Sequence, residues 1–516
     1  MHPKLEDYQK RKAKLMELGG LDKIEKQHAK GKLTCRERLE LLFDEGTFEE
    51  IGLFVTSRSY ELGMDKNYTP ADGVVTGFGR VNGRKVYAYA NDFTVMAATS
   101  AEMNSLKITR LMEEAIAVGC PIVALVESGG GRLQEHSNGG NHLFNASVRA
   151  SGAVPQITAI MGPCTGVGTY NSALSDFVYM VRGTSKMYVT GIKVIKQVNG
   201  EAVDENYFGT PEYNSELSGC CHKVVENDQQ CIEEIKKLLS YLPQNFREKP
   251  PVYPCDADNN KLIDELNYIL PERMKAGYDV LDLISLIVDK DSIYEVQPDF
   301  AKNVVCALTR LNGKTLGVIA NQPMYLGGCI DINASDKMSH FITFCDAYNI
   351  PMLWLADCPG YLPGNDQESG GIIRHGAKAL YAFCSSTVPK VRIATRKYYG
   401  GSKGAYGDRA MGVDYAIAWP TCEESTMGGE GASQIIFAKE LKAAKEQGDE
   451  AYQAKLAECA ERFNAAMDSP YFWAKNLWTD MIIMPDETRR VLVHIYETLE
   501  TKKAALPEKK HGIFPV

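Results

Sequence analysis

The feature that most constrains this chain is an internal repeat. An Asn-Gly turn signal, a continuous apolar run and a glycine-rich loop occur twice in the same order. The matching segments are 80–84 and 310–314, 121–127 and 351–357, and 154–157 and 388–391; the first two pairs are offset by 230 positions (313 minus 83) and the third by 234 (388 minus 154). Such a repeat predicts two homologous units that fold alike.

Each unit is expected to be an α/β domain. Asn82-Gly83 is a strong hairpin signal, and residues 121–126 form the kind of fully apolar strand that lies in a covered sheet. The 516 residues exceed what one hydrophobic core usually organises. The expected division is a charged helical arm at 1–30, an N-terminal domain at 31–250, a proline-rich linker at 251–268 and a C-terminal domain at 269–516.

A glycine-rich loop in each half is the candidate site. Residues 155–160 indicate a buried strand, residues 173–180 are expected to form a helix, and the loop between them lacks the signatures of a P-loop, a dinucleotide-binding turn and a Gly-x-Ser-x-Gly elbow. Its backbone N–H groups would lie at a helix N-terminus, where they suit an anion or a developing oxyanion. A tight packing turn is the alternative, but residues 400–402 repeat the device.

Composition argues against several classes of protein. A formal net charge of -9 at pH 7 disfavours a nucleic-acid-binding surface. No apolar run is long enough to span a bilayer, and the charged N-terminus lacks the apolar core of a signal peptide. The 14 cysteines include no Cys-x-x-Cys pair and are typical of reduced buried thiols, so we expect a cytoplasmic protein without a metal site.

Two similar units with amide-lined loops favour a particular chemistry. Two such holes facing each other would hold two carbonyl compounds that each develop enolate-like charge. A backbone donor to such an oxyanion contributes about 2.7–4 kcal/mol. No catalytic triad or paired carboxylates accompany the loops. A duplicated scaffold whose loops only pack is the alternative.

Longer motifs, in order along nearly the whole chain, carry a resemblance to a known family. They are KGKLTCRERL at 30–39, DGVVTG at 72–77, DFTV at 92–95, MGPC at 161–164, EVQPDFA at 295–301, DINASDK at 331–337, GGIIRHGAK at 370–378 and KKHG at 509–512. Through them the chain resembles the carboxyltransferase subunits of biotin-dependent acyl-CoA carboxylases and decarboxylases. That family includes propionyl-CoA carboxylase β-subunits, methylmalonyl-CoA decarboxylase α-subunits and the large transcarboxylase subunit.

The resemblance implies two tandem crotonase-like domains and a homohexamer of two stacked trimers with active sites between subunits. The backbone N–H groups of Gly166 and Val167 would hold the thioester carbonyl of an acyl-CoA. Those of Gly401 and Ser402 of a partner subunit would hold the ureido carbonyl of biotin. The other residues assigned in this way are Gly129, Gly130, Thr165 and Gly404 for the substrate and Gly400 for biotin.

The resemblance also implies a mechanism and a set of partners. Carboxybiotin would release CO2, the biotin anion would take the α-proton of the acyl group, and the enolate would attack CO2. The cofactor would then be the base, which accounts for the missing acid–base pair. Met274-Lys275 lacks the flanking pattern of a biotinylated lysine, so biotin would arrive on a separate carrier protein. A biotin carboxylase subunit or a membrane decarboxylase subunit would be the other partner.

The chain departs from the family pattern around both loops. Thr165-Gly166-Val167 stands where the family has Ala-Gly-Gly, and a valine there would be strained if its φ were positive. Lys403-Gly404 stands where the family has Tyr-Asp or similar residues, and the 136–145 segment is shorter than usual. These changes indicate an altered acyl group, with either a roomier pocket at Gly404 or a polar acyl group that meets Lys403.

Four functions therefore remain open. The first is a carboxyltransferase within a carboxylase, and the second is the same site run backwards in the soluble subunit of a membrane-bound, sodium-linked decarboxylase. The third is a non-catalytic scaffold subunit. The fourth is a biotin-independent decarboxylase or hydrolase of the crotonase type, which is disfavoured because the second unit would be idle.

Overall fold

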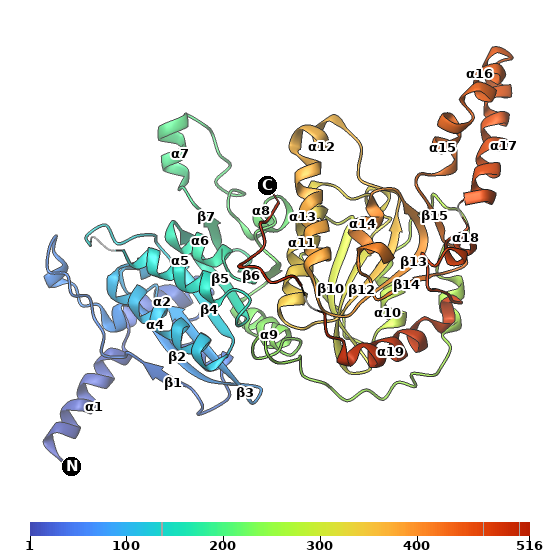
Figure 1. Ribbon diagram of the computed structural model, residues 1–516. Helices are drawn as coiled ribbons and strands as arrows, with labels where there is room; N and C mark the ends of the chain where they lie inside the picture. Colours follow the sequence, from blue (N-terminus) through green and yellow to red (C-terminus); the bar gives the residue numbers. More distant parts are fainter. Residues whose placement is uncertain (136–137, 468, 505, 516) are drawn as a thin grey trace. The chain divides into compact units, whose positions relative to one another are not determined.

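The computed structural model describes residues 1–135, 138–467, 469–504 and 506–515. The chain divides into two compact units, Met1–Pro250 (the N-terminal unit) and Pro251–Val516 (the C-terminal unit). Each unit is built on one largely parallel sheet with helices packed against it (Figure 1).

The sheet of the N-terminal unit has the strand order β1-β2-β3-β4-β5-β6-β8, and β7 pairs with β5 beyond the end of β6. β1, β2 and β3 pair antiparallel, whereas the neighbours from β3 to β6 run parallel. The strands are β1 Glu49–Ile51, β2 Val74–Val81, β3 Arg84–Asn91, β4 Ile122–Ser128, β5 Gln156–Thr165, β6 Phe177–Val181, β7 Lys186–Tyr188 and β8 Lys223–Val225.

The sheet of the C-terminal unit repeats this plan in the order β16-β14-β13-β12-β11-β10-β9, with β15 pairing with β13. Again the first three strands pair antiparallel and the following ones run parallel. The prediction of two tandem homologous α/β units is confirmed. The strands are β9 Tyr294–Val296, β10 Val304–Leu311, β11 Lys314–Asn321, β12 Met352–Cys358, β13 Lys390–Tyr399, β14 Tyr415–Ala418, β15 Glu423–Ser425 and β16 Met481–Ile482.

Helices connect the parallel strands in both units. Those of the N-terminal unit are α1 Pro3–Met16, α2 Leu21–His28, α3 Cys35–Leu42, α4 Glu102–Val118, α5 Gly139–Ala150, α6 Val167–Ala173, α7 Ile192–Asn199, α8 Pro211–Glu216 and α9 Asp228–Leu239. Those of the C-terminal unit are α10 Val280–Ile287, α11 Ile332–Ala347, α12 Asn365–Gly370, α13 Ile372–Ser385, α14 Ser402–Tyr406, α15 Gly429–Ile436, α16 Ala438–Glu446, α17 Asp449–Met467, α18 Pro470–Lys475 and α19 Thr488–Thr498.

Local sequence explains both hairpins of the repeat. Asn82 and Gly83 have φ of 50° and 78°, and Asn312 and Gly313 have φ of 52° and 74°. Two successive left-handed residues form the turn that matches the twist of paired strands. The N–H groups of each pair donate to one carboxylate, that of Asp44 in the N-terminal unit and that of Asp289 in the C-terminal unit.

One element differs from the expected secondary structure. Residues 173–180 were expected to be helical, but the helix is α6, formed by the glycine-rich segment itself, and Phe177–Val181 is the parallel strand β6. Every residue of β6 is buried. Its aromatic and β-branched side chains suit a strand that is covered on both faces, and this tertiary burial outweighs local helix propensity.

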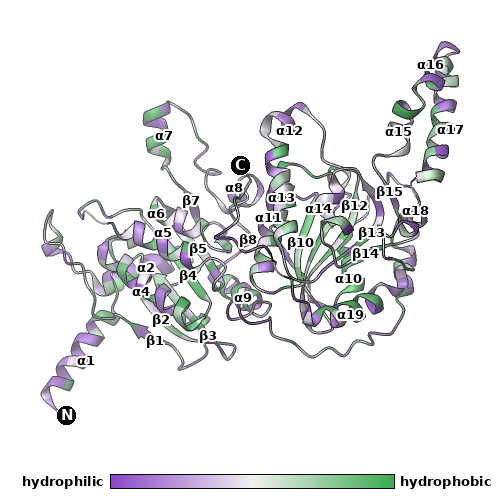
Figure 2. Cartoon of the chain, viewed as in Figure 1, coloured by the Kyte–Doolittle hydropathy of each residue, from purple (hydrophilic) through white to green (hydrophobic). Residues whose placement is uncertain are grey.

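The cores lie between the sheets and the helices that cross them. In the N-terminal unit, apolar residues of α4 and α5, such as Leu111 and Leu143, pack with Ile122 and Ala124 of β4. Hydrophobic colour accordingly follows the central strands, whereas α1 is mostly hydrophilic (Figure 2). Because the central strands of each sheet run parallel, their carboxyl ends, and the loops that follow them, lie at one edge of the sheet.

Candidate active site

The loop between β5 and α6 presents unpaired backbone N–H groups. Gly166 has φ of 63°, which glycine adopts without strain, and Val167 begins the helix. The Gly166 carbonyl accepts hydrogen bonds from the N–H of Thr169 at 3.1 Å and from its hydroxyl at 2.6 Å. In the described part of the chain, the N–H groups of Gly166 and Val167 donate to no acceptor. The strain that a valine at positive φ would carry does not arise.

A second glycine loop, after β4, lies beside the first. The Gly129 N–H donates to the Ala97 carbonyl at 2.9 Å, and the Gly130 carbonyl accepts from the Ser100 N–H at 2.8 Å. A methyl group placed on Gly130 would lie 3.1 Å from the Thr165 hydroxyl, and one placed on Gly166 would lie 3.9 Å from the Gly130 Cα. The structure therefore brings together the residues predicted for the acyl-CoA side: Gly129, Gly130, Thr165, Gly166 and Val167.

The buried Arg132 anchors this second loop. Its guanidinium lies 2.7 Å from the Asp72 carboxylate and 2.9 Å from that of Glu135, and it donates to the Thr99 carbonyl at 3.3 Å. Burial raises the pKa of Asp72 above its usual range, while the charge of Arg132 opposes that shift. Arg132 is thus an internal anchor of the loop, a role that the sequence did not reveal.

A buried charge cluster supports the end of β4 from below. The Glu127 carboxylate lies 2.5 Å from Lys32 Nζ and 2.5 Å from an Arg38 guanidinium nitrogen. Arg38 also lies 2.7 Å from Asp228, so two cations balance two anions. Burial lowers the pKa of Lys32. Gly162 leaves room for this cluster, since a methyl group there would lie 2.5 Å from a Glu127 oxygen.

The corresponding loop of the C-terminal unit offers a different pair of donors. Gly400 has φ of 58°, and its carbonyl accepts from the Lys403 N–H at 3.2 Å, as Gly166 accepts from Thr169. The Gly400 N–H donates to the Ser425 carbonyl at 3.0 Å and is therefore occupied. Among the described residues, the N–H groups of Gly401 and Ser402 have no acceptor. Gly401 is exposed and Ser402 is buried.

The two unusual residues after Ser402 turn toward the interior of their own unit. Lys403 is 9% exposed, and its Nζ lies 3.4 Å from the centre of the Trp473 ring. Burial lowers the pKa of Lys403 to about 8. A methyl group on Gly404 would lie 2.7 Å from the Leu380 side chain, so the expected roomier pocket at Gly404 does not open here. The assignment of Gly404 to substrate binding stays a prediction.

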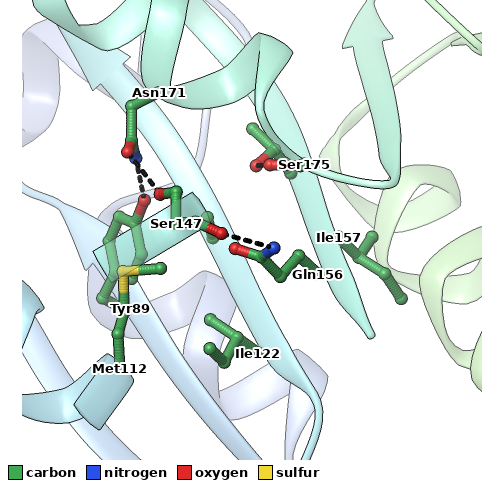
Figure 3. Close-up of a pocket in the computed structure, with 10 residues that line it drawn as sticks. Tyr89, Met112, Ile122, Ser147, Gln156, Ile157, Asn171 and Ser175 are labelled. Carbon is green, nitrogen blue, oxygen red and sulfur yellow. Dashed lines mark hydrogen bonds between the residues drawn. The ribbon is translucent and has the colours of Figure 1, made fainter. Parts of the chain in front are cut away.

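A small pocket beneath α6 is lined by both apolar and hydrogen-bonded polar side chains (Figure 3). Asn171 donates to the Tyr89 hydroxyl at 3.2 Å and accepts from the Ser147 hydroxyl at 2.7 Å. Gln156 donates to the Ser147 carbonyl at 3.1 Å. These bonds tie α6, which carries the Val167 N–H, to β3, α5 and β5.

The described residues do not form the features that other classes of protein would need. In the described ranges, no group of three or more His, Cys, Asp or Glu residues is placed to hold a metal ion. None of the described helices is both long and apolar enough to cross a bilayer. Cys164, near the end of β5, is fully buried, and burial raises its pKa to about 12, so it is a poor nucleophile.

Comparisons with known proteins identify relatives over nearly the whole chain. The carboxyl transferase domain model matches residues 26–514. The chain is 45% identical over 516 residues to the methylmalonyl-CoA decarboxylase subunit alpha of Propionigenium modestum, covering 99% of each chain. It is 42% identical over 520 residues to the propionyl-CoA carboxylase carboxyltransferase subunit of Haloferax mediterranei, covering 100% of each.

A solved structure shows the same fold over the full length. The crystal structure of the transcarboxylase 12S hexamer, with methylmalonyl-coenzyme A and methylmalonic acid bound, superimposes with a TM-score of 0.96 at 43% identity. The match covers 100% of this chain and 99% of that one. The prediction of two tandem crotonase-like domains is confirmed.

Proposed function

The chain belongs to the carboxyl transferase domain family and is an acyl-CoA carboxyltransferase, and we propose that it moves a carboxyl group between biotin on a separate carrier and the α-carbon of a short-chain acyl-CoA. One observation supports this proposal above all. Equivalent strands, β5 and β13, end in glycine turns that each leave at least two adjacent backbone N–H groups without an acceptor among the described residues. Paired donors of this kind suit one carbonyl oxygen that gains negative charge.

The N-terminal turn is assigned to the acyl-CoA. The thioester oxygen would accept from the N–H groups of Gly166 and Val167, which stabilises the enolate formed when the α-carbon gains or loses its carboxyl group. The positive end of α6 adds to this effect. Gly130 and Thr165 would line the approach, because Gly130 lies against both Gly166 and the Thr165 hydroxyl. Gly129 precedes Gly130 in the same loop and would line it too.

The C-terminal turn is assigned to biotin. The residues present fit a ureido carbonyl: Gly401 and Ser402 offer two donors, and Gly400 shapes the turn while its own N–H is engaged by Ser425. When bound, biotin supplies or accepts the carboxyl group. The chain's own contribution is to hold the ureido oxygen.

Several partners follow from this assignment. A biotin carrier protein must bring the cofactor, and a biotin carboxylase subunit or a membrane decarboxylase subunit would complete the cycle in the cytoplasm. A homohexamer is proposed because the structural relative is a hexamer. The decarboxylase relative favours a second candidate, the soluble α-subunit of a sodium-linked acyl-CoA decarboxylase. A non-catalytic scaffold is disfavoured because both turns keep their donors.

The test is loss of the carboxyl group from methylmalonyl-CoA and malonyl-CoA by the purified chain, with and without free biotin. We expect the carboxyl group to be lost only when biotin is present. The preferred substrate will then show which acyl group the chain acts on. Loss without biotin would instead indicate chemistry of the biotin-independent crotonase type. No loss of either carboxyl group would contradict the proposed short-chain substrate class.

A further inference from the structure

The side chain of Val167 is seated on a glycine of the neighbouring helix. A methyl group placed on Gly140, in the first turn of α5, would lie 2.9 Å and 3.1 Å from the two Val167 methyl carbons. Such contacts require a shift, and valine has little rotamer freedom in a helix with which to provide one. Gly140 therefore leaves just enough room for Val167, and the two positions depend on each other.

Val167 also stands beside the unpaired donors. An oxygen bound to the Val167 N–H would lie about 2.9 Å from that nitrogen, which brings the carbonyl carbon that bears it, and the α-carbon next to that carbon, to the same residue. Val167 is only half-buried, as are Thr165 and Gly166, so this stretch of the turn is partly exposed. One turn of helix further on, Tyr170 is 55% exposed and packs edge-on against Phe144 with 6.3 Å between ring centres.

We propose that Val167, held in place by Gly140, is a wall that limits the size of the acyl group, and that Gly140 is its positioning residue. This inference rests on the proposed function, because it assumes that the N-terminal turn holds the thioester. The favoured substrates are acyl-CoA esters with a small α-substituent, such as methyl rather than ethyl. A methylene that meets such an apolar wall changes specificity by roughly 10-fold or more.

The experiment compares native protein with Val167→Ala, Gly140→Ala and the double variant. Turnover of methylmalonyl-CoA and ethylmalonyl-CoA is measured with free biotin, and dissociation constants are measured for propionyl-CoA and butyryl-CoA. Val167→Ala should raise the ethylmalonyl-to-methylmalonyl ratio of kcat/KM by about 10-fold or more. Gly140→Ala should lower kcat/KM for both esters, because it displaces Val167, and Val167→Ala in the same chain should restore it.

The matched control is Val148→Ala, which removes the same atoms from a residue of α5 that is 59% exposed. It should leave unchanged both the ethylmalonyl-to-methylmalonyl ratio of kcat/KM and the ratio of the dissociation constants for butyryl-CoA and propionyl-CoA. An active Val167→Ala variant with native ratios would overturn the inference while leaving the proposed function intact. If turnover is lost, the ratio of the two dissociation constants decides in the same way. Failure of the native protein to bind any acyl-CoA would overturn the proposed function and the inference together.

Discussion

The two units place a carboxylate at the same point, near the end of β4 and near the end of β12, but hold it differently. Glu127 and Asp357 are equivalent, since 357 minus 127 is the repeat offset of 230. Glu127 is paired with Lys32 and Arg38, which precede the sheet in the chain. Asp357 is paired at 2.8 Å with Arg396, which lies on the neighbouring strand β13. Duplicated loops can therefore keep one backbone while their supporting charges come from unrelated positions.

Other supports are repeated faithfully. Lys107 donates to the carbonyls of Ala71 at 2.9 Å and Val74 at 2.6 Å, and Lys337, which is 230 positions later (337 minus 107), donates to that of Val304 at 2.8 Å. Val304 is equivalent to Val74, since 304 minus 74 is again 230. A buried ammonium that satisfies backbone carbonyls fixes a helix to the segment before a strand. We infer that the contacts shared by both units, such as these buried lysines, maintain the fold. The contacts that differ, such as the partners of Glu127 and Asp357, adjust each loop.

The largest effect is expected from neutralising Glu127. Glu127→Gln leaves Lys32 and Arg38 buried without their full counter-charge, which should cost about 3–5 kcal/mol. Hydrogen exchange of core amides measures the loss in each unit separately. The N-terminal unit should lose protection and the C-terminal unit should not. Glu61→Gln, at an exposed carboxylate, is the control. Equal losses in both units, or a loss below about 1 kcal/mol, would show that the cluster is not a local support.

The next effect concerns the donor at Val167. Val167→Pro removes one N–H from the first position of a helix, where proline is well tolerated. If that N–H stabilises the enolate, kcat should fall by about 10²–10³-fold. Val167→Ala keeps the N–H and serves as the control for the lost side chain. A kcat within about threefold of that control would remove Val167 from the catalytic assignment.

A titration effect should distinguish the C-terminal unit. Lys403 stands where the N-terminal turn has Thr169, given the loop offset of 234 (403 minus 169). Its pKa is about 8 in the folded chain instead of the ordinary 10.5. Between these values the unfolded chain binds more protons, so the contribution of Lys403 makes stability rise with pH, by at most about 1.4 kcal/mol per pH unit. The difference in unfolding free energy between native protein and Lys403→Met should therefore rise from pH 8 to pH 10.5. A flat difference would mean that the ammonium titrates normally.

The smallest effect is expected from removing a hydrogen bond in the pocket beneath α6. In the C-terminal unit the apolar Ile319 is equivalent to Tyr89, at an offset of 230 (319 minus 89), and the apolar Ala405 is equivalent to Asn171, at an offset of 234 (405 minus 171). Tyr89→Phe removes the oxygen that accepts from Asn171, which should cost about 0.5–1.5 kcal/mol. Thermal unfolding measures it. An unchanged or raised stability would show that Asn171 finds another acceptor.

Sequence reasoning succeeded where a signal is local. The Asn-Gly turns have the predicted geometry, and the local pattern Thr34-x-x-Glu37 forms a capping box, with the Thr34 N–H donating to Glu37 at 2.7 Å. The likeness of the two glycine turns was visible because glycine is needed at Gly166 and Gly400, where φ is positive.

Sequence reasoning failed where the cause is tertiary. Lys32 and Arg132 were indistinguishable from surface cations, because most lysines and arginines are solvated. The sequence predicts a helix for the segment of β6 because an apolar run of that length has no decisive period. The fit of Val167 to Gly140 joins residues of two helices, and no local pattern reports such a contact.

The central claim is that the two turns serve different substrates, and the biotin dependence of decarboxylation tests it most directly. Gly401 has φ of -65°, so Gly401→Pro removes its N–H while keeping a backbone angle that proline adopts. The rate of methylmalonyl-CoA loss is measured against free biotin for native protein, Gly401→Pro and Gly401→Ala, the last of which keeps the N–H. We predict saturation with biotin in the native protein, a much higher biotin requirement in Gly401→Pro and an unchanged KM for methylmalonyl-CoA. A native rate independent of biotin, or a proline variant that changes only the KM for methylmalonyl-CoA, would contradict the account.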